Sequence, residues 1–425
     1  MKNRVPLLAL VGFLFAGLVG CLKDECTTTR TFTRFDPVYK SVAEIRTGIA
    51  AQSPRAMKNP GKIYYYQNYL LVNEIREGIH VFDNSDPANP KPVVFWSIPG
   101  NVDMAILGNH LYADQYVDLL TLDISDFQNP TVSCRAENVF QLYGYDPYRG
   151  WLVEYAATEV TETLKCSDDR TNQNWWWAGN GGIFIDVAFD AAGPTKSNNS
   201  ASSALSQATG VSGSFARFCF VGPYLYGVDN STLYPFDLAN PACPSKLEAV
   251  PVGWNIETIF PFKDRLFLGS QTGVFIYNAT NPRKPVYESG FTHATGCDPV
   301  VCDENYAFVT VHDGTTCNGE GINSLDIVGI SALPATALLK SYSMTRPLGL
   351  GLAGNLLFLA DDGLKIFDRS DIQSLKLLSH TKGVKAWDVI ALSESHLLVV
   401  GEGGFYQFDT SDPANPKQIS HMAVN

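Results

Sequence analysis

The phrase "FDNSDPANPKP" at Phe82–Pro92 returns almost unchanged as "FDTSDPANPKQ" at Phe408–Gln418, near the other end of the 425-residue chain. In the first copy, Asp83 and Asp86 are suited to accept backbone N–H groups in Asx-type turns. The two prolines cannot continue a hydrogen-bond ladder, so the chain must leave its strand at this point. The phrase therefore predicts a corner between two β-strands, and this structural role accounts for its aspartates without calcium binding or catalysis.

The corner closes a pattern that recurs along the chain, in which a Gly or small polar residue is followed five positions later by Asp or Asn. The eight copies end at Asp83, Asp123, Asp186, Asp237, Asn278, Asp326, Asp368 and Asp409. Most copies are about 41 residues apart, with longer spacings where the third, fourth and sixth copies carry insertions. A period of this length is typical of repeat architectures.

Each repeat contains four short runs rich in β-forming residues. In the first repeat, Tyr69–Val72 and Ile79–Phe82 flank a polar turn, as in a β-hairpin. Four such strands cannot enclose a core alone, so the units must stack. Immunoglobulin-like domains need roughly 100 residues per unit, and helical solenoids need a 3.6-residue period that these runs lack. We expect an all-β chain forming an eight-bladed β-propeller with four antiparallel strands per blade; seven blades with one irregular repeat is the alternative.

The first residues have the pattern of a lipoprotein signal peptide. Two basic residues precede an apolar run that is too short to span a membrane comfortably, and "LVGC" at Leu18–Cys21 has the form of a lipobox. Cleavage would leave Cys21 to carry acyl chains, which bind a bilayer at roughly 0.8 kcal/mol per buried methylene. The sequence therefore predicts a membrane partner reached through a lipid anchor.

Three segments follow from these boundaries. Residues 1–21 form the signal peptide, 22–60 a tether and N-terminal extension with a short helix within Val42–Ala50, and 61–425 the propeller. The tether begins with "LKDE", which resembles a signal that sends lipoproteins to the outer surface of some Gram-negative bacteria; a merely solvated tether is the alternative. We expect an outer-membrane lipoprotein displayed on the cell surface.

The net charge limits the possible partners, and the cysteine content bears on the disulfides. The formal net charge of −12 argues against nucleic acid, because phosphate binding needs a basic face. Eight cysteines besides Cys21 permit disulfides in an exported protein, but eight cysteines allow 105 pairings. Because each pair falls within one repeat, we expect Cys219 to pair with Cys243, and Cys297 to pair with Cys302 or Cys317.

The repeats resemble those of bacterial and archaeal cell-surface proteins built from LVIVD repeats. The likeness covers roughly Gly61–Asn425 and is best in "YLLVNEIREGIHVFDNSDPANPKP", "HLYADQYVDLLTLDISDFQNP", "LLFLADDGLKIFDRSD" and "HLLVVGEGGFYQFDTSDPANPK". The resemblance implies a propeller and no particular activity. "GIFIDVAFDAAG" and "SLDIVGISALP" lack the Asp-Pro corner, so we expect irregular third and sixth copies.

A ring of charged residues is the leading candidate for a ligand site. If the first strand of each unit lines a central channel, its leading residue faces the channel mouth. The residues aligned there are Lys62, Asp103, Gln141, Arg217, Glu257, Asp298, Leu348 and Asp388. The four carboxylates would repel one another unless a cation, the two basic residues or a hydrogen-bonding ligand compensated them. A hydrated channel in which acids pair with bases is the alternative.

An insertion in the third copy supplies the second candidate. "KCSDDRTNQNWWWAGNGG" at Lys165–Gly182 places Trp175, Trp176 and Trp177 among asparagines in a long loop. Exposed tryptophans with amide neighbours can stack on sugar rings or anchor a protein partner. The alternative is that they fold down as a lid on the adjacent blade.

The expected function is binding or scaffolding, with glycans, peptides or surface proteins as partners and with no cofactor expected. The chain contains no G-x-S-x-G, G-x-x-x-x-G-K, C-x-x-C or H-E-x-x-H motif. The competing class is a metal-assisted hydrolase or lyase that holds Ca²⁺ or a similar hard cation between carboxylates. Its ligands would be Asp103, Glu257, Asp298 and Asp388.

Overall fold

The computed structural model describes residues 27–142, 144–165, 214, 216–292, 299–312 and 323–424. Nearly all regular structure in these ranges is β-strand, as predicted. The described part contains one helix, α2 (Val42–Ile45), which begins at a capping box between Ser41 and Glu44 and buries Ile45. None of the helical residues described forms a segment long and apolar enough to cross a membrane.

The chain divides into two compact units. The first comprises Met1–Val38 and Glu154–Ile185, and the second Tyr39–Val153 and Asp186–Asn425. Most of β1 (Thr27–Lys40) and β12 (Gly150–Lys165) belongs to the first unit, and these two long strands pair with each other. The short strand β11 (Tyr145–Asp146) pairs with β12 to complete a three-stranded sheet.

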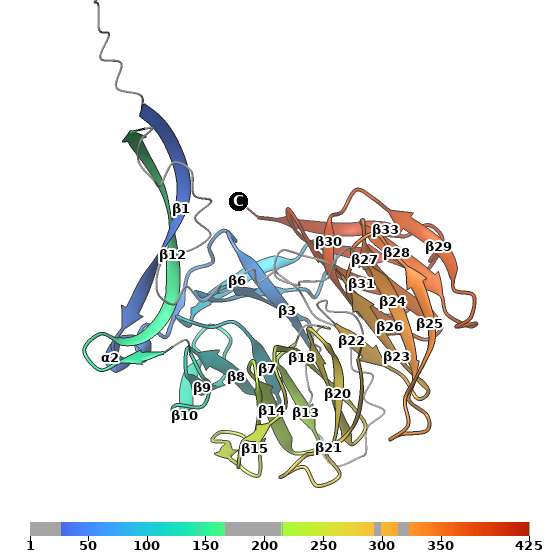
Figure 1. The fold of residues 1–425 in the computed structure, drawn as a ribbon, viewed down its shortest axis with the longest axis horizontal. Helices are drawn as coiled ribbons and strands as arrows, with labels where there is room; N and C mark the ends of the chain where they lie inside the picture. Colours follow the sequence, from blue (N-terminus) through green and yellow to red (C-terminus); the bar gives the residue numbers. More distant parts are fainter. Residues whose placement is uncertain are drawn as a thin grey trace, which may run out of the picture. The chain divides into compact units, whose positions relative to one another are not determined.

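Seven sheets of the second unit share one plan, in which consecutive strands pair antiparallel (Figure 1). Two of them gain a fifth strand, because β2 (Ala50–Gln52) pairs with β6 and β17 (Val250–Pro251) with β15. The first three sheets consist of β3 (Pro60–Tyr66), β4 (Tyr69–Glu74), β5 (Gly78–Asp83) and β6 (Lys91–Ser97); β7 (Met104–Leu107), β8 (His110–Gln115), β9 (Asp118–Asp123) and β10 (Thr131–Ala136); and β13 (Phe218–Val221), β14 (Tyr224–Val228), β15 (Thr232–Asp237) and β16 (Ser245–Lys246).

The other four sheets continue the plan toward the C-terminus. They consist of β18 (Ile256–Phe262), β19 (Arg265–Ser270), β20 (Gly273–Asn278) and β21 (Val286–Thr292); β22 (Val300–Cys302), β23 (Tyr306–Val311), β24 (Ser324–Gly329) and β25 (Ala337–Ser343); β26 (Pro347–Ala353), β27 (Leu356–Asp361), β28 (Leu364–Asp368) and β29 (Lys376–Thr381); and β30 (Ala386–Ser393), β31 (His396–Gly401), β32 (Gly404–Asp409) and β33 (Lys417–Ala423). First strands of successive sheets contact one another.

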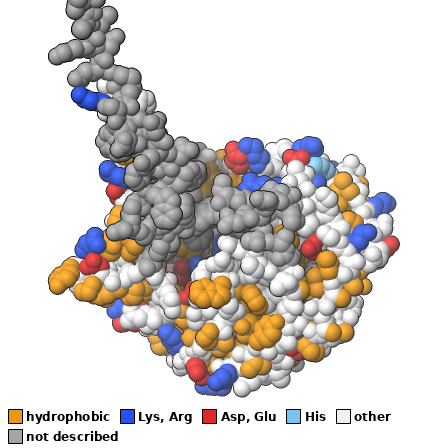
Figure 2. All heavy atoms as spheres, in the orientation of Figure 1, with side chains coloured by type: hydrophobic (Ala, Val, Ile, Leu, Met, Phe, Trp, Pro, Cys, Tyr) orange, Lys and Arg blue, Asp and Glu red, His pale blue; other side chains and the backbone are white. Residues whose placement is uncertain are grey.

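Of the four strands that the sheets have in common, the last is the least buried. In the sheet β26–β29, for example, β27 is buried at five of six positions, whereas β29 has no buried residue. Inner strands are covered on both faces because neighbouring sheets stack on them, so their sequences are continuous apolar runs. Charged side chains lie on the molecular surface among polar and apolar ones (Figure 2).

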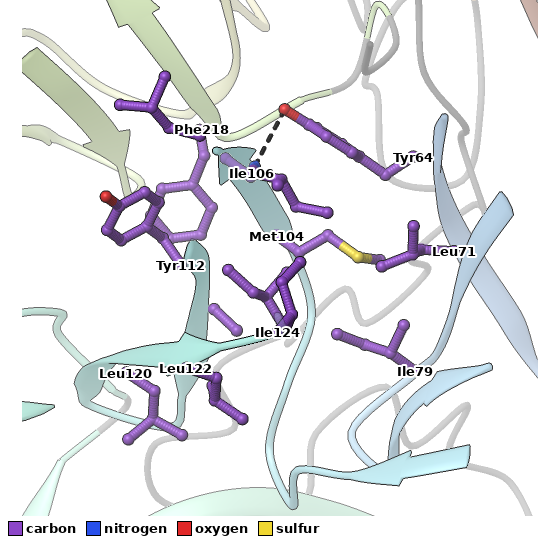
Figure 3. Close-up of a cluster of buried hydrophobic side chains, with 14 of the residues drawn as sticks. Tyr64, Leu71, Ile79, Met104, Ile106, Tyr112, Leu120, Leu122, Ile124 and Phe218 are labelled. Atoms are coloured by element: carbon purple, nitrogen blue, oxygen red, sulfur yellow. Dashed lines mark hydrogen bonds between the residues drawn. The ribbon is translucent and has the colours of Figure 1, made fainter. Parts of the chain in front are cut away.

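Neighbouring sheets share apolar cores. Figure 3 shows Tyr64 of the first sheet beside Ile106 of the second, where the Ile106 N–H donates to the Tyr64 hydroxyl at 3.1 Å. Phe218 of β13 joins the same buried cluster (Figure 3), and Tyr112 of β8 meets Phe220 of β13 edge to face, with ring centroids 5.9 Å apart. The sheets β7–β10 and β13–β17 therefore pack directly against each other.

The Asp-Pro corner forms the predicted turns. The Asp83 carboxylate accepts the Ser85 N–H at 2.9 Å, and the Asp86 carboxylate accepts the Ala88 N–H at 3.1 Å. The closing copy repeats both bonds, with Asp409 accepting from Ser411 and Asp412 from Ala414. The Ser85 hydroxyl also donates to Asp83, which lowers the pKa of that carboxyl.

The corners have a second role that the sequence did not reveal. At six junctions a side chain of one sheet donates to a backbone carbonyl in the corner of its neighbour. The bonds run from Gln407 to Pro87, Trp96 to Phe127, Tyr112 to Pro241, Tyr226 to Pro282, Ser289 to Pro334 and Tyr342 to Ile372. Five of these carbonyls belong to the residue four positions after the Asp or Asn that ends the repeat. The exception is the sixth copy, whose corner was expected to be irregular.

The first and last of the seven sheets also meet. Ile63 and Leu70 share a buried cluster with Ile390 and Leu398, and Gln407 of β32 donates to the corner after β5. Eight blades are not confirmed, because the third copy of the repeat, 181–186, lies outside the described residues and the sheets on either side of it contact each other directly.

The disulfide pattern differs from the expectation. Cys243 pairs with Cys134, which links the last strand of the sheet β7–β10 to the corner after β15. Cys219 and Cys302 are buried free thiols, so pairing of Cys219 with Cys243 and of Cys302 with Cys297 is wrong. Pairs were sought within repeats, whereas this bond joins two neighbouring sheets. Cys297 and Cys317 lie outside the described residues.

Candidate functional site

The pairing between the first and second strands defines an equivalent position at the start of each first strand. Every first strand has one residue that pairs with the fourth residue of its second strand, for example Ile63 with Val72 and Val389 with Val399. We call the residue immediately before it the axial position. The seven axial positions are Lys62, Asp103, Arg217, Thr258, Pro299, Gly349 and Asp388.

Four predicted ring residues occupy axial positions: Lys62, Asp103, Arg217 and Asp388. Glu257 and Leu348 do not, because pairing with the second strands places Thr258 and Gly349, one residue further along the chain, at these positions instead. A shift of one residue moves a side chain to the opposite face of a strand. Asp298 lies outside the described residues, next to the axial Pro299.

Gln141 does not begin a propeller strand. It lies in the connection between β10 and β11, and its backbone N–H donates to the Asp229 carboxylate at 3.4 Å. Asp229 in turn accepts from the Tyr234 hydroxyl at 2.5 Å and from the Thr232 N–H at 2.9 Å. The third copy of the repeat therefore contributes no residue to the axial positions described above.

Three axial residues form one ionic centre. The Lys62 ammonium donates to Asp103 Oδ2 at 2.9 Å, and the backbone N–H of Arg217 donates to the same oxygen at 2.5 Å. Asp103 Oδ1 accepts the Met104 N–H at 2.7 Å. Burial lowers the pKa of Lys62, and the Asp103 charge partly offsets this effect. The carboxylate is thus compensated within the protein.

Asp114 is a buried carboxyl beside this centre that the sequence analysis missed. Its Oδ1 accepts the N–H groups of Val102 at 2.8 Å and Asp103 at 2.9 Å, and the Asn101 amide at 2.9 Å. Burial raises its pKa to about 6, although these hydrogen bonds and the Arg217 charge act in the opposite direction. The sequence feature that could have revealed Asp114 is the position of an acidic residue within the strand sequence "HLYADQ".

Asp388 is buried completely. Its Oδ1 accepts from the Ser214 hydroxyl at 3.0 Å, and its Oδ2 has no partner among the described residues. Burial raises its pKa well above the ordinary value, and the Lys62 charge opposes the shift only weakly. Gly349 makes room for this side chain, because an added Cβ would lie 1.7 Å from Asp388 Oδ1.

Among the described residues, the predicted ring of carboxylates does not assemble as a cation site. Asp103 is bonded to Lys62, and Glu257 accepts from the Gln271 amide at 3.0 Å away from the axial positions. Within the described ranges no three His, Cys, Asp or Glu side chains are placed to hold a metal ion. The hydrolase alternative is therefore not supported. Cys21 and Trp175–Trp177 lie outside the described residues.

Residues 100–137 match the family model of the LVIVD repeat. The matched segment contains the whole sheet β7–β10 and its corner. The fold and this match define the class of protein: an all-β repeat protein with propeller-like sheets that carries an LVIVD repeat. The resemblance drawn from the sequence is confirmed.

Several solved structures are similar at low sequence identity. The computationally designed Ika8 protein has a TM-score of 0.49 at 9% identity, covering 89% of this chain and 92% of its own. A functionally unknown protein from Desulfotomaculum acetoxidans has a TM-score of 0.49 at 12% identity, covering 84% and 96%. PorZ, a surface component of the type-IX secretion system of Porphyromonas gingivalis, has a TM-score of 0.45 at 12% identity, covering 88% and 39%. No curated protein matches the chain.

Proposed function

We propose that the chain is a lipid-anchored binding or scaffold protein displayed on the outer surface of the outer membrane. The lipobox at Cys21 supports the anchor, and the formal charge of −12 supports partners other than nucleic acid. Glycans, peptides or other surface proteins are the proposed partners. They would bind at the mouth of the central channel, beside the axial positions, and at the loop that carries Trp175–Trp177.

The observation that carries a binding role over a catalytic one is the compensation of the buried axial charges. Asp103 is bonded to Lys62 and to the Arg217 backbone, and Asp114 accepts three hydrogen bonds. These hydrogen bonds fix both side chains in place, so that moving either carboxylate toward a substrate or an ion would break buried bonds. We therefore interpret Asp103, Asp114 and Lys62 as a structural polar cluster at and beside the axial positions.

The proposal includes a ring of seven blades. Seven blades are supported by the series of contacts between sheets. Corner hydrogen bonds occur at six junctions, including the one between the last sheet and the first, and a shared core occurs at the remaining junction, between β26–β29 and β30–β33. Each sheet then covers its neighbour, and no apolar blade face is left open. The third copy of the repeat is the irregular one.

Labelling and protease accessibility test the anchor. Cells given an alkyne-bearing palmitate should label the wild type but not Cys21→Ser, and proteinase added to intact cells should degrade the wild-type protein. Labelling of the serine variant would remove the lipid anchor from the account. Complete protection from proteinase would place the protein on the periplasmic side of the membrane.

Thermal unfolding with and without EDTA tests the binding role against the metal-assisted alternative. An ion bound to the native state alone would raise the melting temperature. We expect the same melting temperature in EDTA and in millimolar CaCl2. A reproducible rise with Ca²⁺ that disappears in Asp388→Asn would favour the enzyme class instead.

A further inference from the structure

Trp254 is an exposed aromatic residue that takes no part in the cores or in the axial centre. It is 79% exposed and lies in the connection between β17 and β18. A single exposed apolar side chain is ordinary and is not a site by itself. Two further features distinguish Trp254: the hydrogen bonds that hold its loop, and the polar side chains that adjoin this loop.

Backbone hydrogen bonds hold the loop on both sides of Trp254. The Val252 N–H donates to the Ser231 carbonyl at 2.9 Å, and the Ile256 N–H donates to the Asn230 carbonyl at 2.9 Å. Both acceptors belong to the turn between β14 and β15. Only three residues lie between the two donors, so the loop has little freedom to change its path.

The backbone conformations beside Trp254 restrict the loop further. Gly253 has a φ of 128°, which only glycine adopts readily, and Asn255 has a φ of 54°, in the left-handed region that asparagine tolerates. An added Cβ at Gly253 would meet the Phe275 ring at 3.3 Å. The indole is thus presented to solvent from a fixed base.

Three amides and a carboxylate form a row beside this loop, which we call the amide row. Asn230 Nδ2 donates to Asn255 Oδ1 at 3.3 Å, Asn255 Nδ2 to Gln271 Oε1 at 3.1 Å, and Gln271 Nε2 to Glu257 Oε1 at 3.0 Å. The row crosses from the sheet β13–β17 to the sheet β18–β21. Each amide nitrogen carries two hydrogens and uses one here, so each keeps a donor for a ligand.

We propose that Trp254 and the amide row form a binding site for a neutral carbohydrate. The face of an indole ring covers the apolar face of a sugar ring. A sugar hydroxyl both donates and accepts, which matches the amide oxygens and N–H groups that alternate along the row. Because the row is already ordered by its own hydrogen bonds, binding orders few additional side chains.

Other ligand classes fit the same surface less well. The formal charge of −12 repels polyanions. An extended peptide would pair with an open strand edge, whereas this site presents side chains from turns. The site consists of described residues only and does not depend on Cys21, the axial positions or Trp175–Trp177.

Affinity electrophoresis tests the proposal with the whole chain, made as Cys21→Ser so that it stays in solution. Gels containing dextran, laminarin, xylan or mannan serve as the probes, and gels containing polygalacturonate or casein represent the other ligand classes. At least one neutral polysaccharide should retard the protein. Trp254→Ala should weaken that binding about tenfold or more, as loss of a central aromatic contact does.

Matched variants make the result specific. Trp254→Phe keeps an aromatic face and should retain most of the binding, and Gln271→Ala should weaken it several-fold. Tyr148→Ala removes another aromatic side chain, 98% exposed in the turn between β11 and β12, and should change nothing. Unchanged melting temperatures would show that the variants fold.

Several outcomes would overturn the site. They are a wild type that no neutral polysaccharide retards, a Trp254→Ala variant that binds as well as the wild type, and a Trp254-dependent retardation by polygalacturonate or casein alone. Glycan binding that survives Trp254→Ala but is lost on replacing Trp175–Trp177 with alanine would leave the proposed binding function standing and reject this site.

Discussion

At the scale of single residues, the axial positions decide which charges meet where the first strands of neighbouring sheets begin. Lys62 and Arg217 bring positive charge to a place where Asp103 and Asp388 bring negative charge, and the remaining positions are uncharged. A buried charge is tolerated only when it is paired and hydrogen-bonded, or when it is neutralised by a proton. Asp103 follows the first route, and the raised pKa of Asp388 indicates the second.

Gly349→Ala should destabilise the protein. The new methyl group would overlap Asp388 Oδ1, which is fixed by the Ser214 hydroxyl. We expect the free energy of unfolding to fall by roughly 2–3 kcal/mol, as overpacking of a buried site does, measured by urea denaturation. Gly383→Ala is the matched control, because no atom lies within 4 Å of its added Cβ. Equal losses in the two variants would contradict the tight fit.

Asp114→Asn should change how stability depends on pH. The native pKa of about 6 exceeds the unfolded value of 3.8, so native Asp114 keeps a proton that the unfolded chain loses. Its contribution to stability is complete below pH 4 and is lost as pH rises through 6. Asparagine keeps the acceptor oxygen but does not titrate, so its contribution to stability does not fall as pH rises. Relative to wild type, the variant should gain about 3 kcal/mol between pH 3.5 and 7.5; parallel curves from denaturation would contradict the buried carboxyl.

At the scale of elements, the corner after the third strand joins neighbouring sheets as well as turning the chain. In five of the six contacts its carbonyl lies four residues after the closing Asp or Asn, and a neighbouring sheet supplies the donor, as Tyr112 does for Pro241. The donors are tyrosine, tryptophan, serine and glutamine from different strands. Their lack of a common position explains why the sequence did not disclose the contact.

Tyr112→Phe should isolate the energy of one corner contact. The substitution removes the hydroxyl that donates to the Pro241 carbonyl at 2.9 Å and keeps the buried ring. We expect a loss of about 1 kcal/mol in the free energy of unfolding, typical of a single buried hydrogen bond. Tyr145→Phe, at an exposed ring, should be neutral. A neutral Tyr112→Phe would mean that the corner carbonyl does not hold the sheets together.

The sequence predicted the elements better than their register. Strand runs, corners and four of the axial residues followed from the repeat alone, because each depends on local patterns. The displacement of Glu257 and Leu348 by one residue did not, since the register of a first strand is decided by its pairing with the second strand. Trp254 was missed because its significance depends on Asn230 and Gln271, which come together only in the fold.

At the scale of the whole molecule, neighbouring sheets stabilise one another. No single sheet encloses a core, and the buried clusters each span two or more sheets. The disulfide between Cys134 and Cys243 adds a covalent link between the sheets β7–β10 and β13–β17, which precede and follow the third copy of the repeat in the sequence. This junction distinguishes the inferred seven-bladed ring from the eight blades expected from counting repeats.

Replacing Cys134 and Cys243 together with serine should weaken this junction. Their 109-residue separation in sequence means that the bond restricts the unfolded chain strongly, and we expect a loss of roughly 2–4 kcal/mol. Calorimetry under non-reducing conditions would measure it, and peptide mapping should recover Cys134 linked to Cys243. Recovery of Cys243 linked to Cys219 would contradict the covalent link between these two sheets.

An experimental density map of the ring tests the central claim most directly, because the number of sheets and the state of the axis are visible in one measurement. The account predicts seven sheets around one axis, with Lys62 and the Arg217 backbone bonded to Asp103 in the presence of millimolar Ca²⁺. An eighth sheet between β7–β10 and β13–β17, or a cation coordinated by Asp103 and Asp388, would contradict it.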